Sequence, residues 1–165
     1  MSVIRKEKVT GPSAWKGKDL RDDDSWIYHW SEKSIAAMER ALENVKSKGL
    51  TVPDFTKGDF PIPEMAEEIA YFNEELEDGR GFILIRGLPV ERYSDEDVAI
   101  IYYGLGLNMG VPVSQNIKGD MLGHVRDIRA QDTRKVRVYE TSEYLPYHAD
   151  LADVVGLCSL RKAKS

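Results

Sequence analysis

Apolar residues recur at helical spacing in the first half of the chain. After Ser31 they stand three or four positions apart, and a glycine follows where a helix commonly ends: Ile35, Met38, Leu42, Val45 and Gly49. This spacing gathers the apolar side chains on one helix face, because an α-helix has about 3.6 residues per turn. The pattern therefore predicts an amphipathic helix that begins after Ser31 and ends near Gly49.

Two further helices are predicted by similar patterns. A connector with Pro53, Pro61 and Pro63 leads to a second apolar series that again ends at a glycine: Met65, Ile69, Phe72, Leu76 and Gly79. Ser94 and Asp97 then have the spacing of a capping box, with Asp in place of the usual Glu. The apolar series that follows them predicts the third helix: Val98, Ile101, Tyr102 and Leu105.

Strand-like segments lie mainly in the second half of the chain. The short apolar run 82–85, between Gly81 and Gly87, predicts a strand buried on both faces. Segments near 121–128, 136–140 and 154–160 also favour strands, and polar turns separate them. Helices followed by strands indicate an α+β domain whose sheet is only beginning at Ser165, so we expect the sequence to be cut short.

Residues 1–30 show no helical or strand periodicity and are interpreted as an irregular arm. Gly11, Pro12, Gly17 and three successive aspartates interrupt any regular pattern, while Trp15, Trp26 and Trp30 offer large side chains that could anchor the arm. Residues 31–165 then form part of a single domain.

The composition narrows the classes of partner. The chain is 42% hydrophobic and 31% charged, as is usual for globular domains, and its net charge of -5 disfavours a nucleic-acid partner. The N-terminus carries no signal-peptide core, and the single Cys158 cannot form an internal disulfide, so a cytoplasmic location is expected. No apolar run is long enough for a membrane span.

His148 and Asp150 form the most informative pair of polar residues. In an extended strand, residues two apart project to the same face, so an imidazole and a carboxylate at these positions can reach one ion. Two histidines and one carboxylate are the ligand set of non-haem Fe(II) oxygenases, and the pair supplies two of the three. The triplet alone is a weak signal. The alternative is a strand-edge histidine that hydrogen-bonds a neighbouring carboxylate.

The order of several segments strengthens the metal interpretation. These are Gly81-Phe-Ile-Leu-Ile-Arg-Gly87, Gly104-Leu-Gly106, Gly110-Val-Pro112 and Leu145-Pro-Tyr-His-Ala-Asp150. The arrangement resembles the TauD/TfdA family of Fe(II)- and 2-oxoglutarate-dependent oxygenases from about Gly81 to Ser165. The resemblance implies N-terminal helices packed on the first strands of a double-stranded β-helix, a clavaminate synthase-like jelly-roll that is incomplete in this chain.

The resemblance also implies a reaction. A protein of this family uses Fe(II), 2-oxoglutarate and O2 to oxidise, usually to hydroxylate, a small organic molecule. His148 and Asp150 would be iron ligands, whereas the second histidine and the 2-oxoglutarate-binding arginine would lie beyond Ser165. The 165 residues alone would therefore be inactive. His29 and His124 precede the ligand pair, and the family's order gives no reason to make either a ligand.

Other residues are weaker candidates. The resemblance places substrate or cosubstrate contacts near Glu143, Tyr144 and Tyr147, which could instead shape a loop. Gln115 and Asn116 follow the Val111-Pro112 turn and could face the pocket, although both are ordinary turn residues. Cys158 lies in an apolar, strand-like run and is expected to be a core thiol. Two other functions stay open, a cupin-like metal-binding protein and a truncated, non-catalytic paralogue. The substrate and the oligomeric state do not follow from the pattern.

Overall fold

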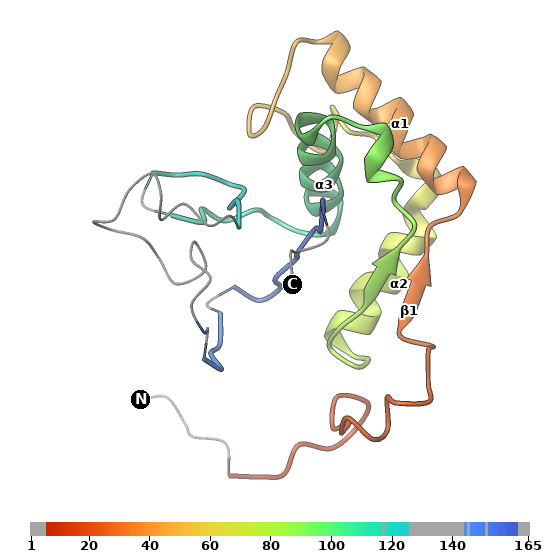
Figure 1. The fold of residues 1–165 in the computed structure, drawn as a ribbon, viewed down its shortest axis with the longest axis vertical. Coiled ribbons are helices and arrows are strands. Elements are labelled where there is room, and N and C mark those ends of the chain that lie inside the picture. Colours follow the sequence, from red (N-terminus) through yellow and green to blue (C-terminus); the bar gives the residue numbers. More distant parts are fainter. Residues whose placement is uncertain (1–5, 117, 126–143, 145, 151, 162–165) are drawn as a thin grey trace. The chain divides into compact units, whose positions relative to one another are not determined.

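The computed structural model describes residues 6–116, 118–125, 144, 146–150 and 152–161. The chain divides into two compact units, Met1–Gly110 and Val111–Ser165, and each is described by itself. All helices and strands of the described residues belong to the first unit (Figure 1). In chain order they are β1 (Ile27–His29), α1 (Glu32–Ser47), the 3-10 helix η1 (Pro63–Met65), α2 (Ala66–Glu77), β2 (Leu84–Arg86), the 3-10 helix η2 (Val90–Arg92) and α3 (Asp95–Met109).

Helix α1 confirms the first predicted helix, and its ends have clear local causes. The Ser31 hydroxyl oxygen accepts a hydrogen bond from the Ser34 backbone N–H at 3.0 Å and so caps the first turn. The chain leaves the helix at Gly49, whose φ of 66° lies in the left-handed region that glycine adopts without steric cost. Met38, Leu42 and Val45 are buried, as the apolar spacing predicts.

Helices α2 and α3 are also confirmed. Ile69 and Phe72 of α2 are buried, while α3 buries Val98 and Ile101 among others. The predicted capping box at the start of α3 is complete. The Asp97 N–H donates to the Ser94 hydroxyl at 3.1 Å, and the Asp97 carboxylate accepts from the Ser94 N–H at 3.3 Å. Aspartate therefore serves here in place of the usual glutamate.

The core of the first unit is tightest where the connector between α1 and α2 meets α3. The Phe60 side chain is fully buried, and its ring lies over Gly104 of α3. A β carbon at position 104 would stand only 2.3 Å from Cγ of Phe60. The Asn108 side-chain amide donates to the carbonyls of Phe60 (3.2 Å) and Gly104 (2.8 Å), which ties the connector to the helix.

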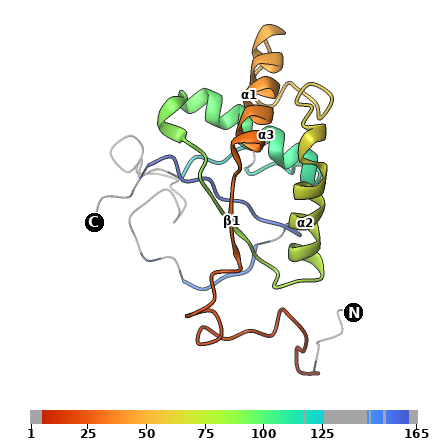
Figure 2. The same ribbon diagram turned by 90° about the vertical axis from the view of Figure 1, so that its right-hand side faces the viewer.

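Strands β1 and β2 form a parallel pair in which Ile27, Tyr28 and His29 are in register with Leu84, Ile85 and Arg86. Figure 1 shows the two arrows side by side, and Figure 2, turned by 90°, shows α2 running beside them. The rings of Tyr28 and Phe72 are 4.9 Å apart, so α2 packs against this pair.

Three expectations about strands need correction. Residues 27–29, within the arm expected to be irregular, form a strand because β2 supplies its hydrogen-bond partner. The strand at 84–86 is not buried on both faces, since Leu84 is 37% exposed in a two-stranded sheet. The described parts of the other β-prone segments, 121–125 and 154–160, form no strand, because no strand elsewhere in the described ranges pairs with their backbone. Segment 136–140 lies outside the described residues.

The three tryptophans anchor residues 15–30 as expected. The Trp15 and Trp26 rings lie 5.0 and 5.7 Å from that of Phe82, and the Trp15 indole N–H donates to the Arg80 carbonyl at 3.0 Å. The Trp30 ring is 5.5 Å from Phe72. Within the described ranges, no helix is long and apolar enough to cross a membrane.

One carboxylate links β1, α1 and α2. Oε1 of Glu68 accepts hydrogen bonds from the Tyr28 hydroxyl (2.5 Å) and the Ser34 hydroxyl (2.6 Å). Burial of the phenol, together with the Glu68 charge beside it, raises the pKa of Tyr28 to about 12.

The contact between Gly104 and Phe60 predicts opposite effects for two alanine substitutions in α3. Gly104→Ala should lower the free energy of unfolding by about 1–3 kcal/mol, because the ring must move. Gly106→Ala should leave it unchanged or raise it by up to about 1 kcal/mol, because nothing lies within 4 Å of the added β carbon. Urea denaturation of both variants measures the difference, and equal stabilities would contradict this description of the packing.

The contact between Tyr28 and Glu68 predicts a loss of stability at high pH. A free tyrosine ionises near pH 10, so between about pH 10 and 12 the unfolded chain loses this proton before the folded chain does. The stabilisation is therefore complete below pH 10 and declines as pH rises through 12. Tyr28→Phe should flatten this part of the stability profile, and Glu68→Gln should let Tyr28 ionise at lower pH in an ultraviolet titration. An unchanged profile in Tyr28→Phe would refute the assignment.

Candidate metal centre

His148 and Asp150 lie close together in the second unit. Nε2 of His148 is 3.8 Å from Oδ1 of Asp150, and about half of each side chain is exposed. This separation is too long for a hydrogen bond, so Nε2 of His148 and Oδ1 of Asp150 do not bind each other. Residues 146–150 form no strand, contrary to expectation, because no strand among the described residues pairs with them. The two side chains are nevertheless neighbours, as their spacing predicts.

The other ring nitrogen of His148 has a backbone partner. Nδ1 lies 2.9 Å from the carbonyl oxygen of Pro146, a normal hydrogen-bond distance. A histidine that binds a metal through one nitrogen commonly donates the other N–H to a carbonyl or carboxylate. The imidazole nitrogen and carboxylate oxygen that face each other are ligand types that Fe(II) accepts, so this pair fits a non-haem iron site.

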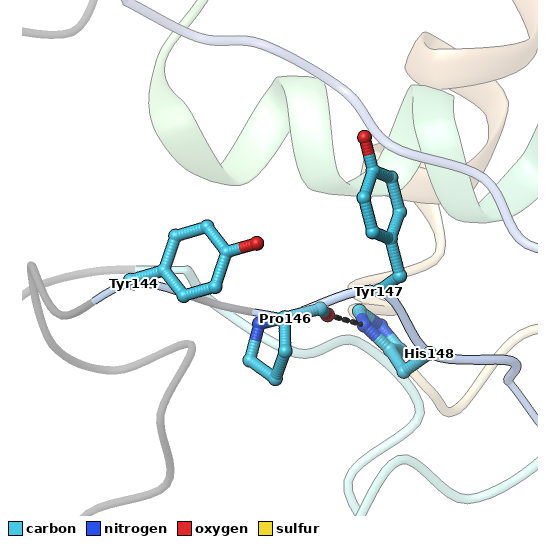
Figure 3. Close-up of a pocket in the computed structure, with 4 residues that line it drawn as sticks. All are labelled: Tyr144, Pro146, Tyr147 and His148. Carbon is cyan, nitrogen blue, oxygen red and sulfur yellow. Dashed lines mark hydrogen bonds between the residues drawn. The ribbon is translucent and has the colours of Figure 1, made fainter.

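An open hollow adjoins the histidine. It has a volume of about 380 Å³ and is lined by Tyr144, Pro146, Tyr147 and His148. Figure 3 shows the Tyr144 ring on one side of Pro146, with its hydroxyl pointing toward the side of Tyr147, and the Tyr147 ring on the other side, projecting away from the His148 imidazole. Both tyrosines are strongly exposed, at 78% and 103%. The structure thus places two candidate residues beside the proposed ligand, and their contact with a substrate stays a prediction.

Gln115 and Asn116 have local roles in a turn that ends near Asp120. The Asn116 side-chain oxygen accepts from the N–H groups of Lys118 (2.9 Å) and Asp120 (3.3 Å), and its amide donates to the Asp120 carboxylate at 2.6 Å. The Gln115 amide donates to the Val113 carbonyl at 2.8 Å. These contacts show why an amide side chain stands at each position. A second role beside a substrate remains a prediction.

The structure describes most of the remaining residues singled out in the sequence. Glu143 lies outside the described residues. His29 is an exposed residue of β1 rather than of a loop, and His124 is exposed on irregular chain. Cys158 is exposed, so the expectation of a core thiol was wrong. In the part of the chain that the structure describes, no group of three or more His, Cys, Asp or Glu residues is arranged to hold a metal.

Sequence reasoning did not identify Pro146 as part of the site. Its contribution is a backbone carbonyl, which every residue carries, so no side-chain motif marks it. The distance between this carbonyl and the His148 ring depends on the backbone angles of Tyr147 and the torsions of His148, which the sequence alone does not reveal.

His148 and Asp150 are a candidate pair of metal ligands, and comparison with known proteins shows what the chain is similar to. No family model matches the chain. It is 32% identical over 166 residues to FR-33289 synthase of Streptomyces rubellomurinus (strain ATCC 31215), an alignment that covers 99% of this chain and 49% of that protein. It is 23% identical over 167 residues to the taurine hydroxylase-like protein SAT17 of Stachybotrys chartarum (strain CBS 109288 / IBT 7711), covering 94% of this chain and 43% of that protein.

The chain is therefore homologous to TauD-like Fe(II)- and 2-oxoglutarate-dependent oxygenases, as its motifs predict. It spans about half the length of the curated relatives it matches. The homology supports a relation to this class of oxygenase.

The turn at Asn116 predicts a local effect of substitution. Asn116→Ala removes the acceptor of two backbone N–H groups, so amide hydrogen exchange at Lys118 and Asp120 should accelerate by about fivefold, the equivalent of about 1 kcal/mol. Gln115→Ala leaves this Asn116 acceptor in place and is the matched control. Equal exchange rates in the two variants would show that Asn116 does not hold the turn.

Proposed function

We propose that the protein catalyses the Fe(II)- and 2-oxoglutarate-dependent oxidation, most simply the hydroxylation, of a small organic molecule. One combined observation carries the proposal: His148 and Asp150 approach within 3.8 Å in a chain that aligns over 99% of its length with a member of this oxygenase class. The net charge of -5 favours a small molecule over nucleic acid as substrate.

In this proposal, His148 and Asp150 are metal ligands and not acid–base catalysts. A neutral imidazole and an ionised carboxylate together place one negative charge beside a divalent ion, and two such ligands leave most of the coordination positions free. Bound iron would supply the chemistry that reduces O2 while 2-oxoglutarate is converted to succinate and CO2. The third protein ligand and the arginine that binds 2-oxoglutarate are proposed to lie beyond Ser165.

The residues around the hollow are proposed to receive part of the substrate. Tyr144 and Tyr147 present exposed rings beside His148, and such rings combine a large apolar surface with a hydroxyl that can hydrogen-bond. Substrate held between these rings would lie next to the proposed iron ligand. The hollow is open, so contacts from the rest of the protein would be needed to exclude water from the reaction.

Substitution of the proposed ligand tests this function in the natural polypeptide. His148→Ala should abolish stoichiometric Fe(II) binding and iron-dependent succinate formation. The Asp150 carboxylate would then be the one ligand left of the proposed pair, which is too few to hold the ion there. His124→Ala is the matched control, since it removes an exposed histidine outside the pair, and it should retain both properties. Normal iron content and turnover in His148→Ala would refute the assignment.

A further inference from the structure

We infer that residues 11–25 form a releasable strap, which is held closed by a clasp around Arg80 and opens while the core of the first unit stays folded. This stretch precedes β1 and is the irregular chain drawn in red in Figure 1. Its residues are exposed, apart from Leu20 and Asp23, which are half-buried. A segment with so little buried surface opens at a lower free energy than a packed core.

The strap meets the rest of the first unit at the turn between α2 and β2. The Trp15 ring packs edge-on against Phe82, with the ring centroids 5.0 Å apart, and the Trp15 indole N–H donates to the Arg80 carbonyl at 3.0 Å. Other hydrogen bonds of the strap close within it, such as that from the Asp19 N–H to the Lys16 carbonyl. Bonds of this kind do not hold the strap to the unit, so its closure depends on the contacts at the turn.

The Arg80 guanidinium joins the helix to the strap. On the helix side, it lies 3.2 Å from the Glu75 carboxylate of α2. On the strap side, it donates to the Ser25 hydroxyl at 2.5 Å and lies 3.6 Å from the Asp23 carboxylate. The side chains of Arg80 and Asp23 are 24% and 42% exposed, so water and salt reach this ion pair. The clasp is therefore sensitive to ionic strength.

An unpaired donor at the end of the strap weakens its closed form. Nε1 of Trp26 is buried and has no hydrogen-bond partner within the described residues. A buried N–H without an acceptor is destabilising, and it regains a partner when water reaches it. The Phe82 ring packs against Trp26, at 5.7 Å, as well as against Trp15. Release of Trp15 uncovers one side of this ring and so favours access of water to the region.

The strap thus acts as a salt-sensitive switch on the first unit. In its closed form, Phe82 is covered by Trp15, and Arg80 is engaged by Ser25 and Asp23. In its open form, the Phe82 ring and the Arg80 guanidinium face solvent together, directly before β2.

Hydrogen exchange of the Trp15 indole N–H in the natural polypeptide measures the opening directly, because this proton is bonded to the Arg80 carbonyl only in the closed strap. The tryptophans would be labelled with ¹⁵N, and Trp15→Phe assigns the signal. We expect a protection factor well above one, yet about tenfold or more below those of the buried α1 amides of Met38 and Val45. Protection equal to that of these amides, or no protection, would overturn the inference.

Arg80→Gln tests the clasp. It removes the charge between Asp23 and Glu75, so exchange of the Trp15 indole N–H should accelerate about three- to tenfold. Arg86→Gln makes the same change at an exposed position of β2 and should leave this rate unchanged. Equal Trp15 rates in the two variants would refute the role of Arg80. An equal acceleration of the α1 amides in Arg80→Gln would show that the strap does not open by itself.

Salt provides a second test of the same contact. Raising the NaCl concentration from about 0.05 M to about 1 M should accelerate Trp15 exchange more in the wild-type protein than in Arg80→Gln, because the variant has no ion pair left to screen. The same response to salt in both proteins would contradict an ionic clasp.

Discussion

The first unit is organised around a close approach that only glycine permits. The Phe60 ring occupies the space above Gly104, and the connector before α2 reaches this place because Asn108 holds the Phe60 carbonyl. Burying an aromatic ring contributes strongly to the stability of a small domain, so the gain outweighs the modest helical cost of a central glycine. Helices α1, α2 and α3 then enclose one continuous core.

Polar contacts add further links between the helices and strands of the first unit. Glu68 joins β1 to α1 and α2 through two short hydrogen bonds, and Lys46 of α1 lies 2.9 Å from Asp97 in the first turn of α3. The Lys46–Asp97 ion pair is partly exposed, with side-chain exposures of 44% and 18%, and such pairs contribute at most about 1 kcal/mol, whereas Glu68 receives its hydrogen bonds in a partly buried setting. The first unit therefore has its own core, while the proposed ligands belong to the second.

Local patterns in the sequence were sufficient to predict the helices. Each depends on residues a few positions apart, such as the Ser94–Asp97 capping box, so neighbouring letters carry the necessary information. The pairing of β1 with β2 was missed because it joins distant segments, and a three-residue strand such as Ile27–His29 has too little periodicity to be recognised. Cys158 was misjudged for a related reason: apolar neighbours indicate burial only when another element covers them.

The candidate site was predictable in part. The spacing of His148 and Asp150 predicts their proximity, since residues two apart share a face of extended chain, and homology supports the class of chemistry. The Pro146 carbonyl and the open hollow depend on backbone direction, which side-chain identity does not specify. In the jelly-roll that the resemblance implies, partner strands would pair with segment 146–150, which pairs with no strand within the described residues.

The His148–Asp150 pair would have a different role in an oxygenase and in a cupin-like metal-binding protein. In an oxygenase, the metal couples O2 to a cosubstrate, whereas in a cupin-like binding protein the same donors only hold an ion. Oxygen uptake by the natural polypeptide, supplied with Fe(II) and 2-oxoglutarate and followed together with succinate, separates these cases most directly. We predict oxygen uptake that depends on 2-oxoglutarate and is matched by succinate formation. A metal-loaded, folded polypeptide that consumes no oxygen under these conditions would contradict it.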